Sequence, residues 1–392
     1  MHKYYFFKGS AILSKLIFLG FVVPSLSEGQ YGEYYFSVSV SLVISRLISF
    51  ANEEYIPSKI NENNKGLFLG CYFFLMTSSL FLVFIYFVSR EVLILIPFLS
   101  SSLAANVTLG GIIRLGSPLL HCYLANMPFI LFTVLCLMFD VSNHSELLMM
   151  FGFSMILSQV PIFSIIYSSV KIPSIQFIKK YYFSINSFKE WAGKVLSNIL
   201  VISNLRVSII ISYFLIGSND EIAIALTISE IYWQLLMVWI NKNYSHLMSE
   251  RRNKIEYIFI LKKYSLFLLF LFFSSYFFLE ITKWFFSIYK FEFLLPIDIK
   301  DISLYQSALV MASGFSFSSI LRVVVFSLEK FDEYNSYNFY YFQLFTLFIL
   351  ALLTLVFVFF GFSFVFIFIT QGVVLFLLSS GYLMHVFKRL LQ

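Results

Sequence analysis

The sequence contains little charge for its size. Asp, Glu, Lys and Arg make up 12% of the chain, compared with about 25% in average soluble domains. Apolar residues make up 59%, so the chain has too little polar surface to face water on all sides. We therefore predict a protein that crosses a membrane several times. The apolar runs lack the two-residue alternation of an outer-membrane barrel, which predicts helical spans.

Residues that carry catalytic or metal chemistry are also sparse. The three cysteines fall in apolar runs and are interpreted as small buried side chains, not as a disulfide or metal set; they are Cys71, Cys122 and Cys136. The five histidines are scattered without a paired spacing. The sequence has no ATP-binding loop of the GxxxxGK(S/T) type and no nucleophile–base pair. We therefore expect no enzymatic activity, no cofactor, no metal and no nucleic-acid partner.

Hydropathy indicates twelve spans, since each needs about 20 mainly apolar residues. They cover approximately 6–26, 33–53, 66–88, 92–114, 117–139, 147–169, 195–216, 221–241, 257–280, 303–326, 339–360 and 363–386. No small-residue cleavage site follows the first run, so we expect that run to be retained as a helix. Placing the N-terminus in the cytoplasm assigns twenty Lys and Arg residues to inside connections and four to outside ones. This bias predicts that both termini are cytoplasmic.

The spans divide into two groups of six. We expect an N-terminal lobe over 1–170, a cytoplasmic linker over 171–194 and a C-terminal lobe over 195–392. The linker mixes Lys with Ile, Phe and Tyr, so it is either a basic loop or a helix lying in the membrane interface. The segment GEYYFSVSVSLVISRL resembles DEIAIALTISEIYWQL, and GGIIRLGSP resembles SSILRVVVF. These matches suggest parallel repeats, as in transporters that bind substrate between two lobes.

Basic residues inside predicted spans are the strongest functional signal, because a Lys or Arg at a span centre costs roughly 2.5–3.5 kcal/mol on insertion scales. The repeat places Lys15 opposite Arg206. Polar side chains share a face of the eighth span with Glu230. We predict a central cavity lined by Lys15, Arg46, Arg206, Thr227, Glu230 and Gln234. A cationic cavity suits a substrate that carries phosphate or carboxylate.

Each of these charges also has a purely structural interpretation. Arg206 and Glu230 can form a buried ion pair between spans seven and eight, and Lys15 can be a packing residue satisfied by a neighbour. Arg46 has Glu53 two turns away on the same face. Further charges near the inner ends of spans are candidates for the cytoplasmic mouth of the cavity, or else ordinary interface anchors. They are Lys8, Glu53, Arg114 and Arg322.

The opening segment GSAILSKLIFLGFVVPSLSEGQYGEYYFSVSVSLVISRLIS resembles the start of Wzx-type O-antigen flippases and related polysaccharide exporters of the MATE-like MOP superfamily. In that family a first helix rich in small residues is followed by a short outer turn with an aromatic-Gly-x-aromatic pattern. Here the pattern is Tyr31, Gly32 and Tyr34. The resemblance implies an all-α polytopic membrane protein with a MATE/MOP-like fold. About twelve transmembrane helices would form its two six-helix lobes.

The resemblance also implies a function in O-antigen and lipopolysaccharide biosynthesis at the bacterial inner membrane. Such flippases move undecaprenyl-diphosphate-linked O-antigen or capsule repeat units across the bilayer by alternating access. The diphosphate would give Lys15, Arg46 and Arg206 a ligand. Implied partners are the lipid bilayer, the O-antigen polymerase, the chain-length regulator and a coupling proton or sodium ion, for which Glu230 is the candidate.

Two alternatives stay open. A MATE-like small-molecule exporter has the same helix count. Such exporters handle cationic drugs and commonly couple through carboxylates, whereas the charges inside the predicted spans here are mostly basic. An O-antigen polymerase is a membrane glycosyltransferase with a large external loop. The longest outer segment here, 281–302, is short and half apolar, which disfavours the enzyme.

Overall fold

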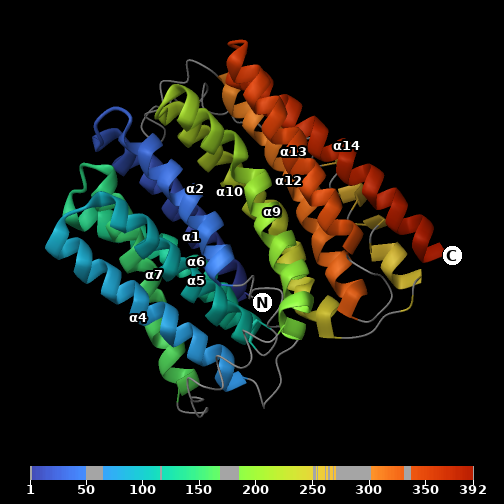
Figure 1. Cartoon of the computed structure of the whole chain (residues 1–392), viewed down its shortest axis with the longest axis horizontal. Helices are drawn as coiled ribbons and strands as arrows, with labels where there is room; N and C mark the ends of the chain where they lie inside the picture. The colour runs from blue at the N-terminus through green and yellow to red at the C-terminus, as the bar shows by residue number, and fades with distance from the viewer. Residues whose placement is uncertain are drawn as a thin grey trace. The chain divides into compact units, whose positions relative to one another are not determined.

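The computed structural model describes residues 2–49, 65–114, 117–167, 185–249, 302–330 and 337–391. It also describes Asn253 and helical positions at 255–260, 262, 263, 265–267, 269 and 270. All regular structure in these residues is helical (Figure 1). The chain divides into two compact units, Met1–Ile202 and Ser203–Gln392. The division falls inside a single helix, α9 (Ile185–Ile216).

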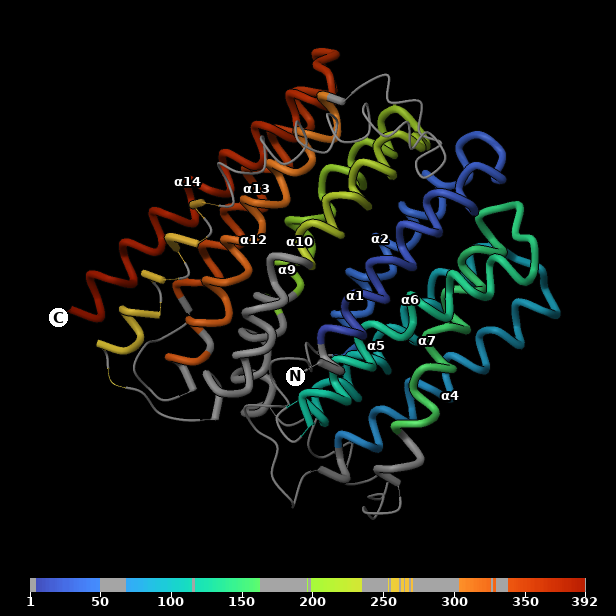
Figure 2. Tube along the Cα trace, turned by 180° about the vertical axis from the view of Figure 1, so that it is seen from behind, coloured from blue at the N-terminus to red at the C-terminus, as the bar shows by residue number. Residues whose placement is uncertain are grey.

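The first unit is built around a buried helix. Its described helices are α1 (His2–Ile17), α2 (Gln30–Ile48), α4 (Lys65–Ser89), α5 (Leu95–Ile113), α6 (Pro118–Phe139), α7 (His144–Tyr167) and the beginning of α9. Helix α5 packs against α2, α4, α6 and α7 (Figures 1 and 2). It is suited to this place because Phe98 and Leu99 are fully buried, while Ala104 and Ala105 let neighbouring helices approach.

Two contacts of α5 show how closely the first unit is packed. A Cβ added to Gly152 of α7 would overlap the ring of Phe98, so only glycine fits there at this helix separation. Helices α4 and α5 are also joined by a hydrogen bond of 2.5 Å between the hydroxyl groups of Ser79 and Ser102. Serine hydroxyls of this kind join helices inside a membrane because no water competes for them.

The second unit is built around α12 (Ile302–Lys330), which packs against α10 (Asp220–Ser249) and α14 (Phe364–Leu391). Helix α14 also packs against α13 (Tyr337–Phe359). The backbones of α12 and α14 touch where Gly314 meets Gly372. A Cβ on Gly372 would lie 2.6 Å from the carbonyl oxygen of Val310. This crossing uses small residues in place of side-chain interdigitation.

The prediction of an all-α, multi-pass membrane protein is confirmed. Within the described residues, nine helices are long and apolar enough to cross a membrane. The predicted spans 33–53 and 221–241 are present as α2 and α10, which are less apolar because serines and charged residues interrupt them. The predicted span 257–280 lies mostly outside the described residues.

Several helices extend beyond the predicted spans. Helix α9 begins at Ile185, ahead of the predicted start at 195, and α10 continues to Ser249, past 241. Helical hydrogen bonding does not stop where an apolar run ends, so hydropathy marks the hydrocarbon segment and not the whole helix. In the predicted linker 171–194, positions 185–194 therefore belong to α9, and 171–184 lie outside the described residues. The predicted lobe limits stay a prediction.

Candidate functional site

Lys15 is buried in the first unit with 7% of its surface exposed. It lies on α1, and its Nζ atom is 4.0 Å from the centre of the Phe129 ring of α6. The two helices are also joined by the Thr133 hydroxyl, which donates to the carbonyl oxygen of Ser14 at 3.0 Å. An ammonium group over an aromatic face is stabilised by the ring quadrupole, by about 2 kcal/mol when both groups are desolvated. This contact offsets part of the cost of a lysine in the span.

The ring beneath Lys15 belongs to an aromatic cluster contributed by several helices. Phe129 packs on Phe151 of α7 at 5.8 Å between ring centres. Phe132 lies 5.2 Å from Phe151, 4.9 Å from Phe18 and 5.7 Å from Tyr34 of α2, with which it stacks. The cluster therefore holds the wall behind Lys15 rigid, since each ring is fixed by at least one neighbour.

The backbone of the first span changes form shortly after Lys15. Helix α1 ends at Ile17, Phe18–Val22 forms a π-helical segment, and Val23–Ser25 forms a 3₁₀ turn. Pro24 lies in that turn and has no N–H to donate to a regular α-helix. Irregular helical turns of this kind concentrate at functional sites. The sequence analysis had not identified this change, although Pro24 is its signal.

Arg46 lies in the last turn of α2 and is half-buried. Its predicted partner Glu53 lies outside the described residues, so the alignment of these two charges stays a prediction. Lys15 and Arg46 are brought into one unit by the fold, whereas Arg206 belongs to the other. A shared cavity for the three cations therefore also stays a prediction.

Arg206 and Glu230 form the buried ion pair that the sequence analysis considered as an alternative. The Arg206 Nη2 atom bonds to Glu230 Oε1, which joins α9 to α10 within the second unit. Arg206 is 6% exposed, and Glu230 is half-buried. The pair neutralises two charges that would each be expensive alone in the membrane.

Two further predicted site residues, Thr227 and Gln234, lie on α10. The hydroxyl of Thr227 donates to the Ala223 carbonyl of its own helix at 2.8 Å. Gln234 is half-buried. One turn beyond Glu230, the Trp233 ring packs edge-on against Phe315 of α12 at 5.5 Å. Its indole Nε1 atom is buried and finds no hydrogen-bond acceptor in the described part of the chain.

A buried chain of amides in the second unit was missed by the sequence analysis. Asn204 of α9 donates from Nδ2 to Gln343 Oε1 of α13 at 2.8 Å, and Gln343 donates from Nε2 to the Ser318 hydroxyl of α12 at 3.2 Å. Gln371 of α14 likewise donates to the Thr354 hydroxyl of α13 at 2.7 Å. The signal available in the sequence was an amide side chain inside an apolar run that has no other strongly polar residue. These side chains hold α9, α12, α13 and α14 in fixed register.

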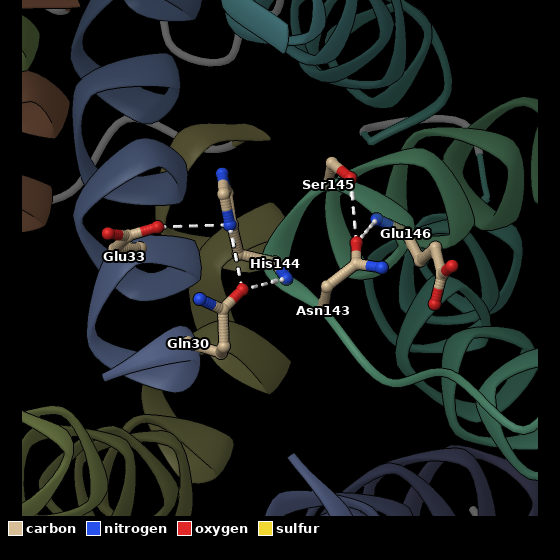
Figure 3. Close-up of polar contacts among 6 residues, drawn as sticks. All are labelled: Gln30, Glu33, Asn143, His144, Ser145 and Glu146. Carbon is tan, nitrogen blue, oxygen red and sulfur yellow. Dashed lines mark hydrogen bonds and ion pairs between the residues drawn. The ribbon is translucent and has the colours of Figure 1, made fainter. Parts of the chain in front are cut away.

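A second missed cluster joins α2 to α7 in the first unit (Figure 3). Gln30 Oε1 accepts a hydrogen bond from the His144 backbone N–H at 2.9 Å, and it also lies 2.9 Å from His144 Nδ1. Glu33 Oε2 is 3.0 Å from the same nitrogen. Asn143 caps α7 by accepting from the Glu146 backbone N–H at 3.0 Å. The start of α7 is therefore held against the start of α2.

The candidates for the cytoplasmic mouth lie on three helices. Lys8 is half-buried on α1, two turns before Lys15. Arg114 is buried directly after the last residue of α5. Arg322 is half-buried within α12, and that helix continues to Lys330. Their role at a mouth stays a prediction.

Known proteins resemble this chain in fold and not in sequence. No protein-family profile matches it, and no curated protein matches it significantly. Among solved structures, it resembles an outward-facing multidrug-resistance MATE family transporter of the MOP superfamily, with a TM-score of 0.58 and 10% identity over 98% of this chain and 96% of the other.

Two further transporters match over nearly the whole length of both chains. One is a MOP superfamily transporter from Pyrococcus furiosus, with a TM-score of 0.54 and 11% identity over 100% of this chain and 94% of the other. The other is a variant of the Vibrio cholerae MATE transporter VcmN, with a TM-score of 0.52 and 12% identity over 100% and 98%. At these identities the likeness establishes architecture alone. The chain is a multi-pass membrane protein with the fold of MATE/MOP transporters.

Proposed function

We propose that this protein is a flippase for undecaprenyl-diphosphate-linked O-antigen or capsule repeat units. The observation that carries the proposal is the buried cationic charge of Lys15 inside a membrane span of a transporter fold. A buried ammonium group is costly in a membrane and is retained where it serves a pathway or a partner. A diphosphate headgroup is a substrate that binds such a charge through strong, charge-assisted hydrogen bonds.

The sign of the buried charges supports an anionic substrate. Lys15 and Arg46 are cationic residues of the first unit. Among the described spans, Glu230 is the carboxylate that does not lie near a helix end. It is paired with Arg206. The similar Pyrococcus furiosus transporter is described as having a binding pocket of reversed polarity that suggests a different function. We infer a comparable departure from drug export here.

We propose that Lys15, Arg46 and Arg206 contact the diphosphate during transport. Lysine acts as a point charge toward phosphate, and arginine binds it through two parallel hydrogen bonds. Thr227 and Gln234 would contribute neutral hydrogen bonds to the oligosaccharide. Lys8, Glu53, Arg114 and Arg322 would act at the cytoplasmic mouth.

The Arg206–Glu230 pair provides a route for energy coupling in this proposal. Binding of a proton or sodium ion at the Glu230 carboxylate would weaken its hold on Arg206. The guanidinium would then be available to a phosphate oxygen. Arg206 would exchange one anionic partner for another, so the buried cation would never be left without compensation.

Small-molecule export is the second candidate because the fold is shared with a multidrug-resistance transporter. That function needs a carboxylate available to a cationic drug. Engagement of Glu230 by Arg206 disfavours it. The solved structures named above are transporters, which favours transport over a membrane glycosyltransferase.

A cellular experiment tests the proposed function and its location in the bacterial inner membrane. Deleting the protein from its host should abolish lipid-linked surface polysaccharide and leave repeat units on the cytoplasmic leaflet. The polymerase and chain-length regulator, as partners acting on the flipped unit, would then lack substrate. Normal surface polymer in a strain without a second flippase would contradict the proposal.

Reconstitution separates the two candidate functions. Proteoliposomes containing the purified protein should expose a labelled undecaprenyl-diphosphate oligosaccharide to an external lectin faster than protein-free vesicles do. The same vesicles should not accumulate ethidium in either direction of an imposed proton or sodium gradient. Ethidium transport without oligosaccharide exposure would favour the small-molecule exporter.

A further inference from the structure

The turn between α13 and α14 is rich in phenylalanine, which makes up three of its five residues. Its sequence from 359 to 363 is FFGFS. Phe359 is 84% exposed, Phe360 69% and Phe362 48%. No Asp, Glu, Lys or Arg occurs anywhere between Glu333 and Lys388. The turn therefore presents a contiguous aromatic surface with no charge to keep it in water.

The other described turn of the second unit shows the contrast. Helices α9 and α10 are joined by Gly217, Ser218 and Asn219, followed by Asp220 and Glu221. Asn219 caps α10 by accepting from the Ile222 backbone N–H at 2.9 Å. This turn has the polar composition expected in water. The two turns lie toward the same end of the unit (Figures 1 and 2).

Three backbone N–H groups of the phenylalanine turn are bonded within the hairpin. The N–H groups of Phe360, Gly361 and Phe362 donate to carbonyl oxygens of the last turns of α13, at 3.0, 3.1 and 2.9 Å. Gly361 makes this closure feasible because its φ of 70° is a left-handed conformation that glycine adopts without strain. The carbonyl of Ser363 accepts from the first turn of α14. Each backbone group bonded in this way lowers the cost of placing the turn beside the acyl chains.

The exposed rings are also held in place by one another. Phe357 lies 5.4 Å from Phe362 and 5.1 Å from Phe366, and Phe362 stacks on Phe366 at 5.2 Å between ring centres. These contacts tie the last turn of α13 to the first turn of α14. The aromatic surface is therefore a formed feature of the hairpin end.

This surface continues the membrane-facing side of α13. Phe348, Leu352 and Leu355 are exposed along the helix and lead to Phe359 at its end. Helix α13 is apolar enough to span a membrane, so those exposed side chains face lipid. No polar or charged boundary separates them from the turn. Lipid covers the exposed side of the helix, so lipid is also the environment that suits the turn.

We propose that the Phe359–Ser363 turn is a lipid-binding surface, embedded in the bilayer at the level of the acyl chains next to the headgroups. The other described turn of this unit would lie in water. Burying one phenylalanine side chain favours the apolar phase by more than about tenfold, and the turn presents several. This proposal does not depend on the transported substrate or on the orientation of the chain.

Spin labelling distinguishes lipid, water and protein as the covering. Cys71, Cys122 and Cys136 are replaced by alanine, and nitroxides are attached in separate reconstituted samples after Phe360→Cys, Ser218→Cys and Phe348→Cys. Collision with oxygen reports lipid, and collision with a water-soluble nickel chelate reports water. We expect the oxygen-to-nickel ratio at 360 to approach that at 348 and to exceed that at 218, because oxygen concentrates in lipid and the nickel chelate in water.

Two results would overturn the proposal. Nickel accessibility at 360 equal to that at 218 would place the turn in water. Low accessibility to both reagents would show that protein covers it. Phe362→Cys provides a second label in the same turn if the first variant fails to fold, as judged by gel filtration and thermal unfolding. Agreement of both labels with the 348 reference supports a lipid-embedded turn.

Discussion

A lysine in a membrane span is useful only if its charge is held where a substrate can reach it. Lys15 is positioned by Phe129, whose face receives the ammonium group, and by the rings that pack behind Phe129. The side chain is therefore fixed against an aromatic face. This arrangement suits reversible binding of an anion, since the aromatic contact can persist while phosphate is bound.

Replacing Lys15 tests this assignment. Lys15→Ala should reduce oligosaccharide flipping about tenfold or more, since a hydrogen bond between charged groups contributes about 1.5–3 kcal/mol. Lys15→Arg should retain part of the activity because the positive charge remains. Lys8→Ala, on the same helix face, serves as the matched control and should have a smaller effect. Stable insertion of both Lys15 variants with full flipping would contradict a substrate-binding role.

The Arg206–Glu230 pair allows a double-variant test. Arg206→Ala leaves the Glu230 carboxylate uncompensated and should lower stability by about 3–5 kcal/mol. Adding Glu230→Gln should restore most of that stability, because no isolated charge then remains. Flipping should stay impaired in the double variant if Arg206 binds substrate. Thermal unfolding in detergent and the proteoliposome assay measure the two effects separately, and full recovery of both would reduce the pair to a structural role.

At the scale of helices, the second unit depends on one glycine crossing. Gly372→Ala should destabilise the protein by about 1–3 kcal/mol, because the added methyl group overlaps the α12 backbone at Val310. Gly381→Ala on the same helix is the control, since a Cβ there meets nothing within 4 Å. It should be neutral or slightly stabilising through its helix propensity. Equal melting temperatures for the two variants would show that α12 and α14 do not pack as described.

Sequence patterns predicted the helices better than the contacts between them. Apolar runs are set by the bilayer, so α4, α5, α6, α12, α13 and α14 follow from hydropathy. The Arg206–Glu230 pair was also predictable, because two opposite charges in adjoining spans attract each other. The bond between Gln30 and His144 was not, since the residues are 114 positions apart and both lie at helix starts. The register of Asn204 with Gln343 depends on packing that no local pattern encodes.

At the scale of the whole molecule, the orientation in the membrane is open to a direct test. The bias of Lys and Arg predicts that both termini are cytoplasmic. Alkaline phosphatase is active only outside the cytoplasm, so a fusion after Ser218 should be active and one after Lys180 inactive. Quantifying both fusions against their expression levels provides the control. The opposite pair of results would invert the topology.

The modest apolarity of α2 and α10 has a consequence for biogenesis. These helices carry Arg46 and Glu230, and they are the described helices that fall short of a typical span. Each follows a strongly apolar helix after a short turn. During synthesis, we expect neither helix to partition by itself from the translocon into lipid. Each should remain in the translocon until it enters lipid together with the preceding helix, as a helical hairpin. Arg46 and Glu230 would thus depend on the apolar helices before them to reach the membrane at all.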